Sequence, residues 1–205
     1  MDTENNIHTI IFDLDGTLYH KRGLVGRMLL RLWWCLPLLI SERMTRKKIV
    51  TCAYDSPELF YEAFFQTMAR GHWWNAKIAR KWYHTIYMPT MVRIIAKHQL
   101  PNTAVINTLH LAKHKGCVTI LFSDYGAVEE KLQAIGLEPA LFSYIIDAPT
   151  LGGLKPNKTV IDKLFTTTNT NPKNTLFIGD RIDKDGAAAQ AVGAEFWHIS
   201  RHDDK

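Results

Sequence analysis

The chain has 205 residues, of which 46% are hydrophobic and 22% are charged, close to the values of ordinary globular proteins. This composition excludes a disordered chain, a collagen-like repeat and a long coiled coil, and the length allows a core with a small second domain. The three cysteines are too few and too scattered for a disulfide framework or a zinc cluster. The N-terminal residues MDTENNIH lack the basic and apolar regions of a signal peptide, so we expect a cytoplasmic protein.

Charge is distributed unevenly along the chain. Residues 21–97 contain 14 Lys and Arg against four Asp and Glu, a net charge of +10. The chain has 25 basic and 20 acidic residues in all, so the remainder holds 11 basic and 16 acidic residues, a net charge of −5. Five of the six tryptophans also lie in the basic stretch: Trp33, Trp34, Trp73, Trp74 and Trp82. This contrast predicts two structural units, one inserted into the other.

The first predicted element is a buried parallel strand over residues 9–12, a short apolar run that ends in Asp13. From residue 25 the apolar spacing becomes helical, and Pro37 is expected to stop the first helix. Further helices are expected over residues 42–53, from Ser56-Pro57 to Gly71, and over residues 74–87. Because strand-like alternation is missing from the sequence between residues 20 and 100, we expect this block to be all helical.

After residue 101 the pattern alternates between helix and strand. Helices are expected at about 103–115, 128–135, 158–165 and 186–192, and strands at 117–122, 144–146, 175–178 and 195–199. Alternation with short links predicts a parallel sheet covered by helices on both faces. In such sheets the chemistry gathers at the carboxyl ends of the strands.

Three predicted strands end in polar residues suited to phosphoryl transfer. The strand at 9–12 is followed by Asp13-Leu14-Asp15-Gly16-Thr17, the strand at 117–122 by Ser123-Asp124, and the strand at 175–178 by Gly179-Asp180. Asp13 and Asp180 could share a Mg²⁺, a hard cation that prefers oxygen ligands. Lys155, in a Gly-Gly-Leu-Lys-Pro loop, could offset the charge of a transferring phosphoryl group together with the metal.

The segments DLDGTL, a strand-terminal serine, Lys-Pro and GDRIDKD, in this order around a helical insertion, resemble the haloacid dehalogenase-like hydrolase superfamily. The resemblance covers roughly residues 7–20 and 102–199 and points to subfamily I, with a helical C1-type cap. It implies an α/β fold: a Rossmann-like three-layer parallel-sheet core of residues 1–20 and 101–205, with an inserted all-helical cap of residues 21–100. The cap resembles the family in position and helical character only.

The resemblance implies a catalytic role for each motif residue. Asp13 would attack phosphorus and form an aspartyl-phosphate. Asp15 would protonate the leaving alkoxide and then activate the hydrolytic water. The Ser123 hydroxyl and the Asp124 backbone N–H would bind phosphoryl oxygens, and Lys155 would hold the nucleophile and the phosphoryl group together.

The resemblance also implies a Mg²⁺ site. Asp13, the backbone carbonyl of Asp15 and Asp180 would bind the metal, and Asp185 would act nearby through a metal-bound water. Asp183 is the competing candidate, because the spacing in this motif varies among relatives. The aspartate that is not at the metal is expected to cap the following helix.

Asp15 bears on the reaction. A halide leaving group needs no proton, and the dehalogenases that the chain resembles lack an acid at this position. We therefore expect a Mg²⁺-dependent phosphatase that hydrolyses a small phosphomonoester. The alternatives are a phosphomutase on the same fold and a non-catalytic binding protein that docks at membranes through its cap.

The basic cap has three interpretations: a solvated polar surface, attraction of an anionic substrate, or peripheral membrane contact through its arginines, lysines, Trp33 and Trp34. We expect most tryptophans to lie in the cap core and one or two to line the pocket. The apolar segment at residues 24–40 has an uncharged run of only nine residues, whereas a spanning helix needs about 20. A nucleic-acid motif is missing from the sequence, so we expect no nucleic-acid partner.

Overall fold

The computed structural model describes residues 7–200 and contains a parallel sheet of five strands in the order β3-β2-β1-β4-β5. The first strand, β1, is central and all four of its residues are buried, as expected for an apolar run without alternation. The strand bounds are Thr9–Phe12 (β1), Val118–Ser123 (β2), Tyr144–Asp147 (β3), Thr175–Gly179 (β4) and Glu195–His198 (β5).

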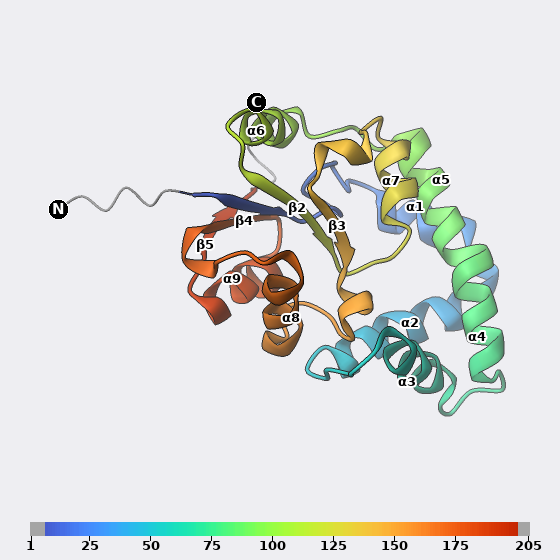
Figure 1. Ribbon diagram of the computed structural model, residues 1–205. Helices are drawn as coiled ribbons and strands as arrows, with labels where there is room; N and C mark the ends of the chain where they lie inside the picture. Colours follow the sequence, from blue (N-terminus) through green and yellow to red (C-terminus); the bar gives the residue numbers. More distant parts are fainter. Residues whose placement is uncertain (1–6, 201–205) are drawn as a thin grey trace.

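Helices cover both faces of the sheet (Figure 1). Ile11 on β1 belongs to the same buried cluster as Leu164 on one face, whereas Phe12 belongs to the cluster of Leu109 and Leu132 on the other. The helices of the first face are α8 (Lys158–Thr168) and α9 (Ala187–Val192), and those of the second are α6 (Thr103–His114) and α7 (Val128–Ala134). The predicted α/β class with a three-layer Rossmann-like core is confirmed.

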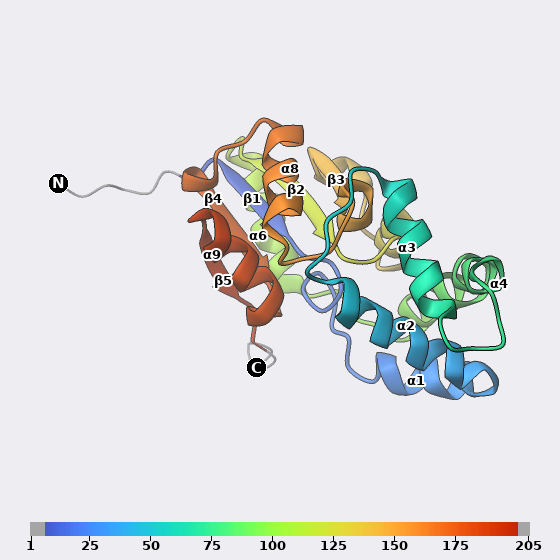
Figure 2. The same ribbon diagram turned by 90° about the horizontal axis from the view of Figure 1, so that it is seen from below.

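The chain between β1 and α6 forms helices, which group beyond the carboxyl ends of the strands (Figure 2). We propose that this group is the cap domain expected at residues 21–100, inserted into the core of residues 1–20 and 101–205. The α-helices are α1 (Leu24–Arg31), α2 (Leu36–Ile49), α3 (Pro57–Ala69), α4 (Ala76–Trp82) and α5 (Met88–His98), and a 3₁₀ turn (Trp33–Cys35) and a π-helical turn (Tyr83–Tyr87) lie between them.

Two local expectations for the cap were wrong. Pro37 lies in the first turn of α2, where its missing N–H is not needed, so it begins a helix at residue 36 instead of stopping one. Three of the five cap tryptophans are exposed, with 73% of Trp33, 57% of Trp34 and 87% of Trp73 accessible to solvent. The cap core is built mainly from phenylalanines and tyrosines of α3 and the π-helical turn, together with the other two tryptophans.

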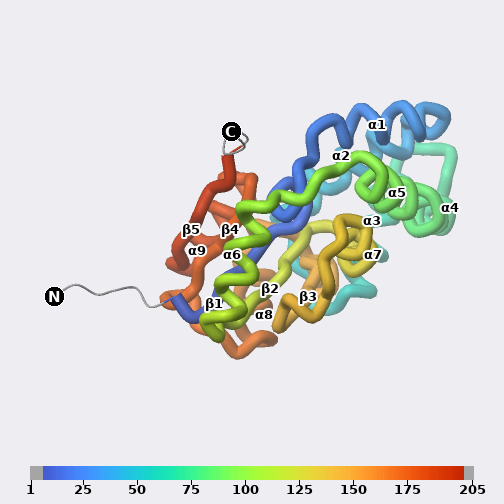
Figure 3. Tube along the Cα trace, turned by 90° about the horizontal axis from the view of Figure 1, so that it is seen from above, coloured from blue at the N-terminus to red at the C-terminus, as the bar shows by residue number. Residues whose placement is uncertain are grey.

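No single helix among residues 7–200 is long and apolar enough to span a membrane. By length and composition alone, α1 together with residues 33–49 passes that test as a pair, but the two are bent by 80°. Figure 3 shows α1 along the outer edge of the cap.

A buried arginine on α2 joins the cap to the core. The guanidinium of Arg46 donates to the backbone carbonyl of Asp124 at 3.0 Å and to the Tyr83 hydroxyl at 2.9 Å, and it forms an ion pair with Glu42. Its face lies 3.8 Å from the centre of the Tyr125 ring. Because both charges of this pair are buried, each depends on the other for compensation.

The loop between α2 and α3 forms a second joint. The Tyr54 N–H donates to the Gly152 carbonyl at 2.7 Å, and the Lys163 ammonium donates to the Tyr54 carbonyl at 2.8 Å. The Asn157 amide donates to the Thr51 carbonyl at 2.9 Å. A Cβ atom on Gly152 would lie 2.0 Å from the Tyr54 carbonyl oxygen, so only glycine allows this approach.

Replacing Arg46 by methionine is expected to lower the free energy of unfolding by about 3 kcal/mol, because Glu42 is left buried without its partner. Urea unfolding measures the change. Arg43→Met, three residues earlier on α2 and exposed, is the matched control and is expected to have little effect. The double variant Glu42→Gln/Arg46→Met is expected to recover part of the lost free energy of unfolding. Equal effects of Arg43→Met and Arg46→Met would contradict the role of Arg46 as the partner of buried Glu42.

Candidate active site

The sheet register brings the polar strand ends together. Phe12 of β1 pairs with Leu121 of β2 and with Ile178 of β4, so the residues that follow these strands emerge at one edge. Parallel strands with helices on both faces present such an edge to the loops that follow them. The residues expected at the site from sequence therefore come from three neighbouring strands and the loop after β3.

Lys155 lies between two carboxylates. Its ammonium is 2.7 Å from Asp13 Oδ1 and 2.7 Å from Asp185 Oδ1, and it donates a third bond to the Phe122 carbonyl at 2.9 Å. The second oxygen of Asp13 accepts a hydrogen bond from the Thr17 hydroxyl at 3.2 Å. Asp13 is thus held at both oxygens at the end of β1.

Asp185 reaches this group, and Asp183 does not. Asp185 is buried in a π-helical turn (Ile182–Gly186), whereas the Asp183 side chain is 66% exposed and forms an ion pair with Arg181. Gly179 leaves room for the approach, because a Cβ atom on it would lie 2.4 Å from Asp185 Cγ. The structure therefore places Asp185 beside Asp13 and Lys155.

Asp180 completes a compact acidic group. Oxygens of Asp13, Asp180 and Asp185 lie within 4.8 Å of one another. Asp180 Oδ2 pairs with the ammonium of Lys21, which also donates to the Asp15 carbonyl at 3.2 Å. Asp180 Oδ1 is buried and has no hydrogen-bond partner among the described residues, so an acceptor oxygen is left at the centre of the group.

Asp15 is held by a second lysine. The Lys131 ammonium, fully buried on α7, lies 3.0 Å and 2.9 Å from the two oxygens of Asp15. The Tyr19 hydroxyl donates to Asp15 Oδ1, and the Ser123 hydroxyl donates to Oδ2 at 3.3 Å. Four hydrogen bonds from three side chains therefore fix the orientation of this carboxylate.

The two catalytic candidates differ in acidity. Burial raises the pKa of Asp13 to about 6, with Lys155 lowering it and Asp185 raising it further. Burial would also raise the pKa of Asp15, but the charge of Lys131 and the hydrogen bond from Tyr19 outweigh it and lower the pKa. Burial would lower the pKa of Lys155, yet the carboxylates of Asp13 and Asp185 raise it well above its ordinary value.

Ser123 and Asp124 lie at the end of β2. Ser123 is fully buried, and its hydroxyl accepts the N–H of Tyr125 at 3.1 Å while it donates to Asp15. The Asp124 carboxylate forms an ion pair with Lys184 and accepts the N–H of Lys155 at 2.8 Å. The structure thus shows these side chains bracing other site residues, and only Asp124 lines the pocket.

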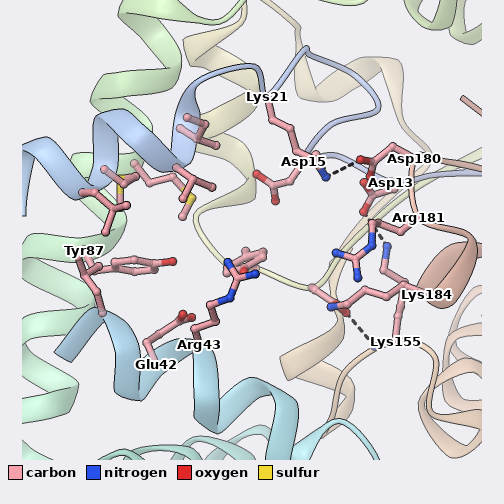
Figure 4. Close-up of a pocket in the computed structure, with 18 of the residues that line it drawn as sticks. Asp13, Asp15, Lys21, Glu42, Arg43, Tyr87, Lys155, Asp180, Arg181 and Lys184 are labelled. Carbon is pink, nitrogen blue, oxygen red and sulfur yellow. Dashed lines mark hydrogen bonds and ion pairs between the residues drawn. The ribbon is translucent and has the colours of Figure 1, made fainter. Parts of the chain in front are cut away.

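A pocket of about 630 Å³ separates this group from the cap. Charged core side chains lie on one side, and Glu42, Arg43 and Tyr87 face them from the cap (Figure 4). None of the tryptophans, all of which the structure describes, lines the pocket. Apart from Lys21, which pairs with Asp180, the rest of the cap wall is apolar: Leu24, Val25, Met28, Leu29, Leu36, Leu39, Ile40 and Met91.

The sequence analysis predicted Lys155 but missed the other three lysines that pair with site carboxylates, and it missed the tyrosine that bonds Asp15. One of them carried a signal: Lys131 lies on the apolar stripe of its predicted helix, three residues after Val128 and four before Ile135. A lysine on such a stripe is unusual unless it pairs with a buried acid. The missed residues are Tyr19, Lys21, Lys131 and Lys184.

The solved structures that resemble the chain belong to proteins that are named for different reactions. A haloacid dehalogenase-like (HAD) phosphatase from Thermococcus onnurineus is 20% identical with a TM-score of 0.59, covering 97% of this chain and 89% of its own. CbbY from Rhodobacter sphaeroides, in complex with phosphate, is 17% identical with a TM-score of 0.65 and coverages of 97% and 90%. A 2-haloacid dehalogenase from Pseudomonas syringae pv. Tomato DC3000 is 16% identical with a TM-score of 0.60 and coverages of 97% and 91%. At these identities the similarity shows the fold alone.

The sequence itself identifies the family. A comparison with curated proteins found no match. The family model described as haloacid dehalogenase-like hydrolase matches residues 7–193, which include every strand end that carries a site residue. The chain belongs to the haloacid dehalogenase-like hydrolases.

Proposed function

We propose that the protein is a Mg²⁺-dependent phosphatase that hydrolyses a phosphomonoester through a phosphorylated Asp13. The observation that carries this proposal is the pair of lysine-held carboxylates at the pocket floor, Asp13 with Lys155 and Asp15 with Lys131. A nucleophile beside an independently oriented proton carrier is what cleavage of a phosphoester bond needs.

In the first half-reaction an Asp13 oxygen forms a bond to phosphorus as the bond to the leaving oxygen breaks. Lys155 offsets the negative charge that gathers at the site. Because the pKa of Asp15 is lowered, this carboxylate is ionised before the substrate binds. The substrate therefore brings the proton for the leaving oxygen by binding as the phosphate monoanion, since the second pKa of a phosphomonoester is about 6. Asp15 relays this proton to the leaving oxygen.

In the second half-reaction water attacks phosphorus, and the bond between phosphorus and Asp13 breaks. Asp15, held ionised by Lys131 and Tyr19, takes the proton from this water. Asp15 passes this proton to the phosphate product or to solvent, inorganic phosphate leaves, and the carboxylates of Asp13 and Asp15 are both restored. The ionised state of Asp15 thus suits the hydrolytic step.

We further propose that Asp13, Asp180 and Asp185 hold the Mg²⁺, with the backbone carbonyl of Asp15 nearby. Carboxylate oxygens within 4.8 Å of one another suit this hard cation, and the unpartnered Asp180 Oδ1 is an available ligand. When bound, the metal would supply positive charge to the phosphoryl oxygens. Asp183 is set aside as a ligand because its exposed carboxylate pairs with Arg181.

The pocket wall favours hydrolysis over the alternative of a phosphomutase. A mutase must hold a sugar and rebind it in a second orientation, which calls for many hydrogen-bonding groups opposite the nucleophile. The cap wall offers only Glu42, Arg43 and Tyr87 among apolar residues. A non-catalytic role would have no use for Asp13 and Asp15 each being held by its own buried lysine.

Asp13→Asn is expected to lower the turnover of an aryl phosphate by about a thousandfold or more, because the nucleophile is lost. Turnover is measured with Mg²⁺ and again with EDTA, which is expected to abolish it in the wild type. Circular dichroism checks that the variant is folded. Full activity in Asp13→Asn would refute the proposed nucleophile.

Lys131→Met is expected to slow the release of a simple alcohol from an alkyl phosphate by about a hundredfold, because Asp15 is no longer held for proton transfer. The first-turnover release of nitrophenol from nitrophenyl phosphate is expected to change far less, since that leaving group needs no proton. Rapid-quench measurements compare the two substrates. Lys158→Met, a surface lysine paired with Asp162, is the matched control, and equal losses for both substrates would argue against the positioning role.

Mg²⁺ is expected to raise the melting temperature by several degrees more at about pH 7.5 than at about pH 5. Because the pKa of Asp13 is raised to about 6 by burial, the metal-free protein loses stability as pH rises through that value. Mg²⁺ bound beside Asp13 is expected to restore that stability above pH 6. Below pH 6, protons compete with Mg²⁺ for the Asp13 carboxylate.

Thermal melts with and without Mg²⁺ measure this effect. Asp185→Asn is expected to remove most of the Mg²⁺ gain, and Asp183→Asn, two residues away and exposed, to keep it. The reverse outcome would place Asp183 at the metal instead.

A further inference from the structure

The outer surface of the cap carries a concentrated apolar patch. Sixteen large hydrophobic side chains are exposed in the described part of the chain, and eight of them lie within residues 25–44. We call these eight the α1–α2 face: Val25, Leu29, Leu30, Trp33, Trp34, Leu36, Ile40 and Met44. Exposed apolar side chains gathered in one short segment are typical of an interaction site.

The α1–α2 face runs into the proposed active-site pocket. Four of its members line that pocket and are also exposed to solvent: Val25, Leu29, Leu36 and Ile40. They are spaced four residues apart on each helix, so each helix presents one apolar stripe to the pocket, and solvent also reaches that stripe. An apolar path therefore leads from the outside of the cap toward Asp13.

The charge around this face is almost entirely positive. Residues 21–50 contain eight Lys and Arg and one acidic residue, Glu42, which is buried against Arg46. The basic residues exposed on or beside the two helices are Arg22, Arg31, Arg43, Lys47 and Lys48. Tryptophans next to basic side chains are typical of proteins that lie at the headgroup level of a bilayer.

The same charge pattern argues against a second copy of the chain as the occupant. Pairing two α1–α2 faces would bring their basic residues together with no exposed acid between residues 21 and 50 to compensate. An anionic bilayer suits both the apolar side chains and the positive charge of the α1–α2 face, since it accepts apolar side chains and attracts Lys and Arg.

Building on the proposed phosphatase activity, we infer that the substrate is a lipid phosphomonoester and that the α1–α2 face docks on the anionic membrane that contains it. The phosphate would reach Lys155 while the aliphatic chain lies along the stripes of α1 and α2. Binding energy from the chain would come from apolar burial, which requires no polar partners on the cap wall. This assignment explains why the pocket is apolar opposite its charged floor.

Vesicle flotation tests the docking surface with the full-length protein. We expect binding to vesicles of phosphatidylcholine with phosphatidylglycerol, weaker binding to phosphatidylcholine alone, and release by high salt. Trp33→Ser/Trp34→Ser is expected to lose the binding, whereas Trp73→Ser, an equally exposed tryptophan between α3 and α4, is expected to keep it. Failure of the wild type to float with anionic vesicles overturns the docking inference. So does a dimer in light scattering that becomes a monomer in the double variant.

Chain-length dependence tests the substrate class. For butyl, hexyl and octyl phosphate in solution, kcat/KM is expected to rise about fourfold per methylene that enters the apolar path. Phosphatidic acid in the anionic vesicles is expected to be hydrolysed by the wild type and Trp73→Ser but not by the double variant. All three proteins should hydrolyse nitrophenyl phosphate equally. A flat chain-length series overturns the substrate class, whereas a wild type inactive on every phosphoester refutes the phosphatase proposal itself.

Discussion

Burying carboxylates requires compensating cations, and this constraint organises the whole site. Five aspartates meet at the carboxyl edge of the sheet, and each contacts a lysine. Those lysines come from four separate segments: Lys21 after β1, Lys131 on α7, Lys155 after β3 and Lys184 after β4. The acidic cluster therefore assembles only when every layer of the core is in place, which couples the chemistry of the site to the completeness of the fold.

The strand-end aspartates were predictable because their position follows from the chain itself. A β/α alternation fixes which end of each strand carries the next loop, so Asp13, Asp180 and Lys155 were expected at one edge, and they lie there. The pairing of Lys131 with Asp15 was not predictable, because it joins residues 116 positions apart, although the apolar stripe around Lys131 indicated that this lysine is buried. The expectation that most tryptophans lie in the cap core misplaced Trp33, Trp34 and Trp73, because composition does not say which apolar side chains are covered by protein.

The fold alone does not determine which reaction the protein catalyses, and the pocket wall reduces the number of candidate reactions. Structures of a phosphatase and of a dehalogenase resemble this chain at TM-scores of 0.59 and 0.60. Two features of this site bear on the reaction: the side chains that hold Asp15 and the cap surface that faces it. Here Asp15, the proposed proton carrier, accepts four hydrogen bonds from three side chains, whereas the facing cap is largely apolar, so we expect polar contacts to orient the phosphate and shape to orient the rest of the substrate.

The joint between the α2–α3 loop and the core has a consequence for motion. Tyr54 and Gly152 meet backbone to backbone, and Lys163 and Asn157 tie the same strip of chain. Together with the contact between Arg46 and the Asp124 carbonyl, this strip fixes the cap to the core at two separate places, so opening the pocket widely requires breaking backbone hydrogen bonds at Tyr54 as well as side-chain bonds at Arg46.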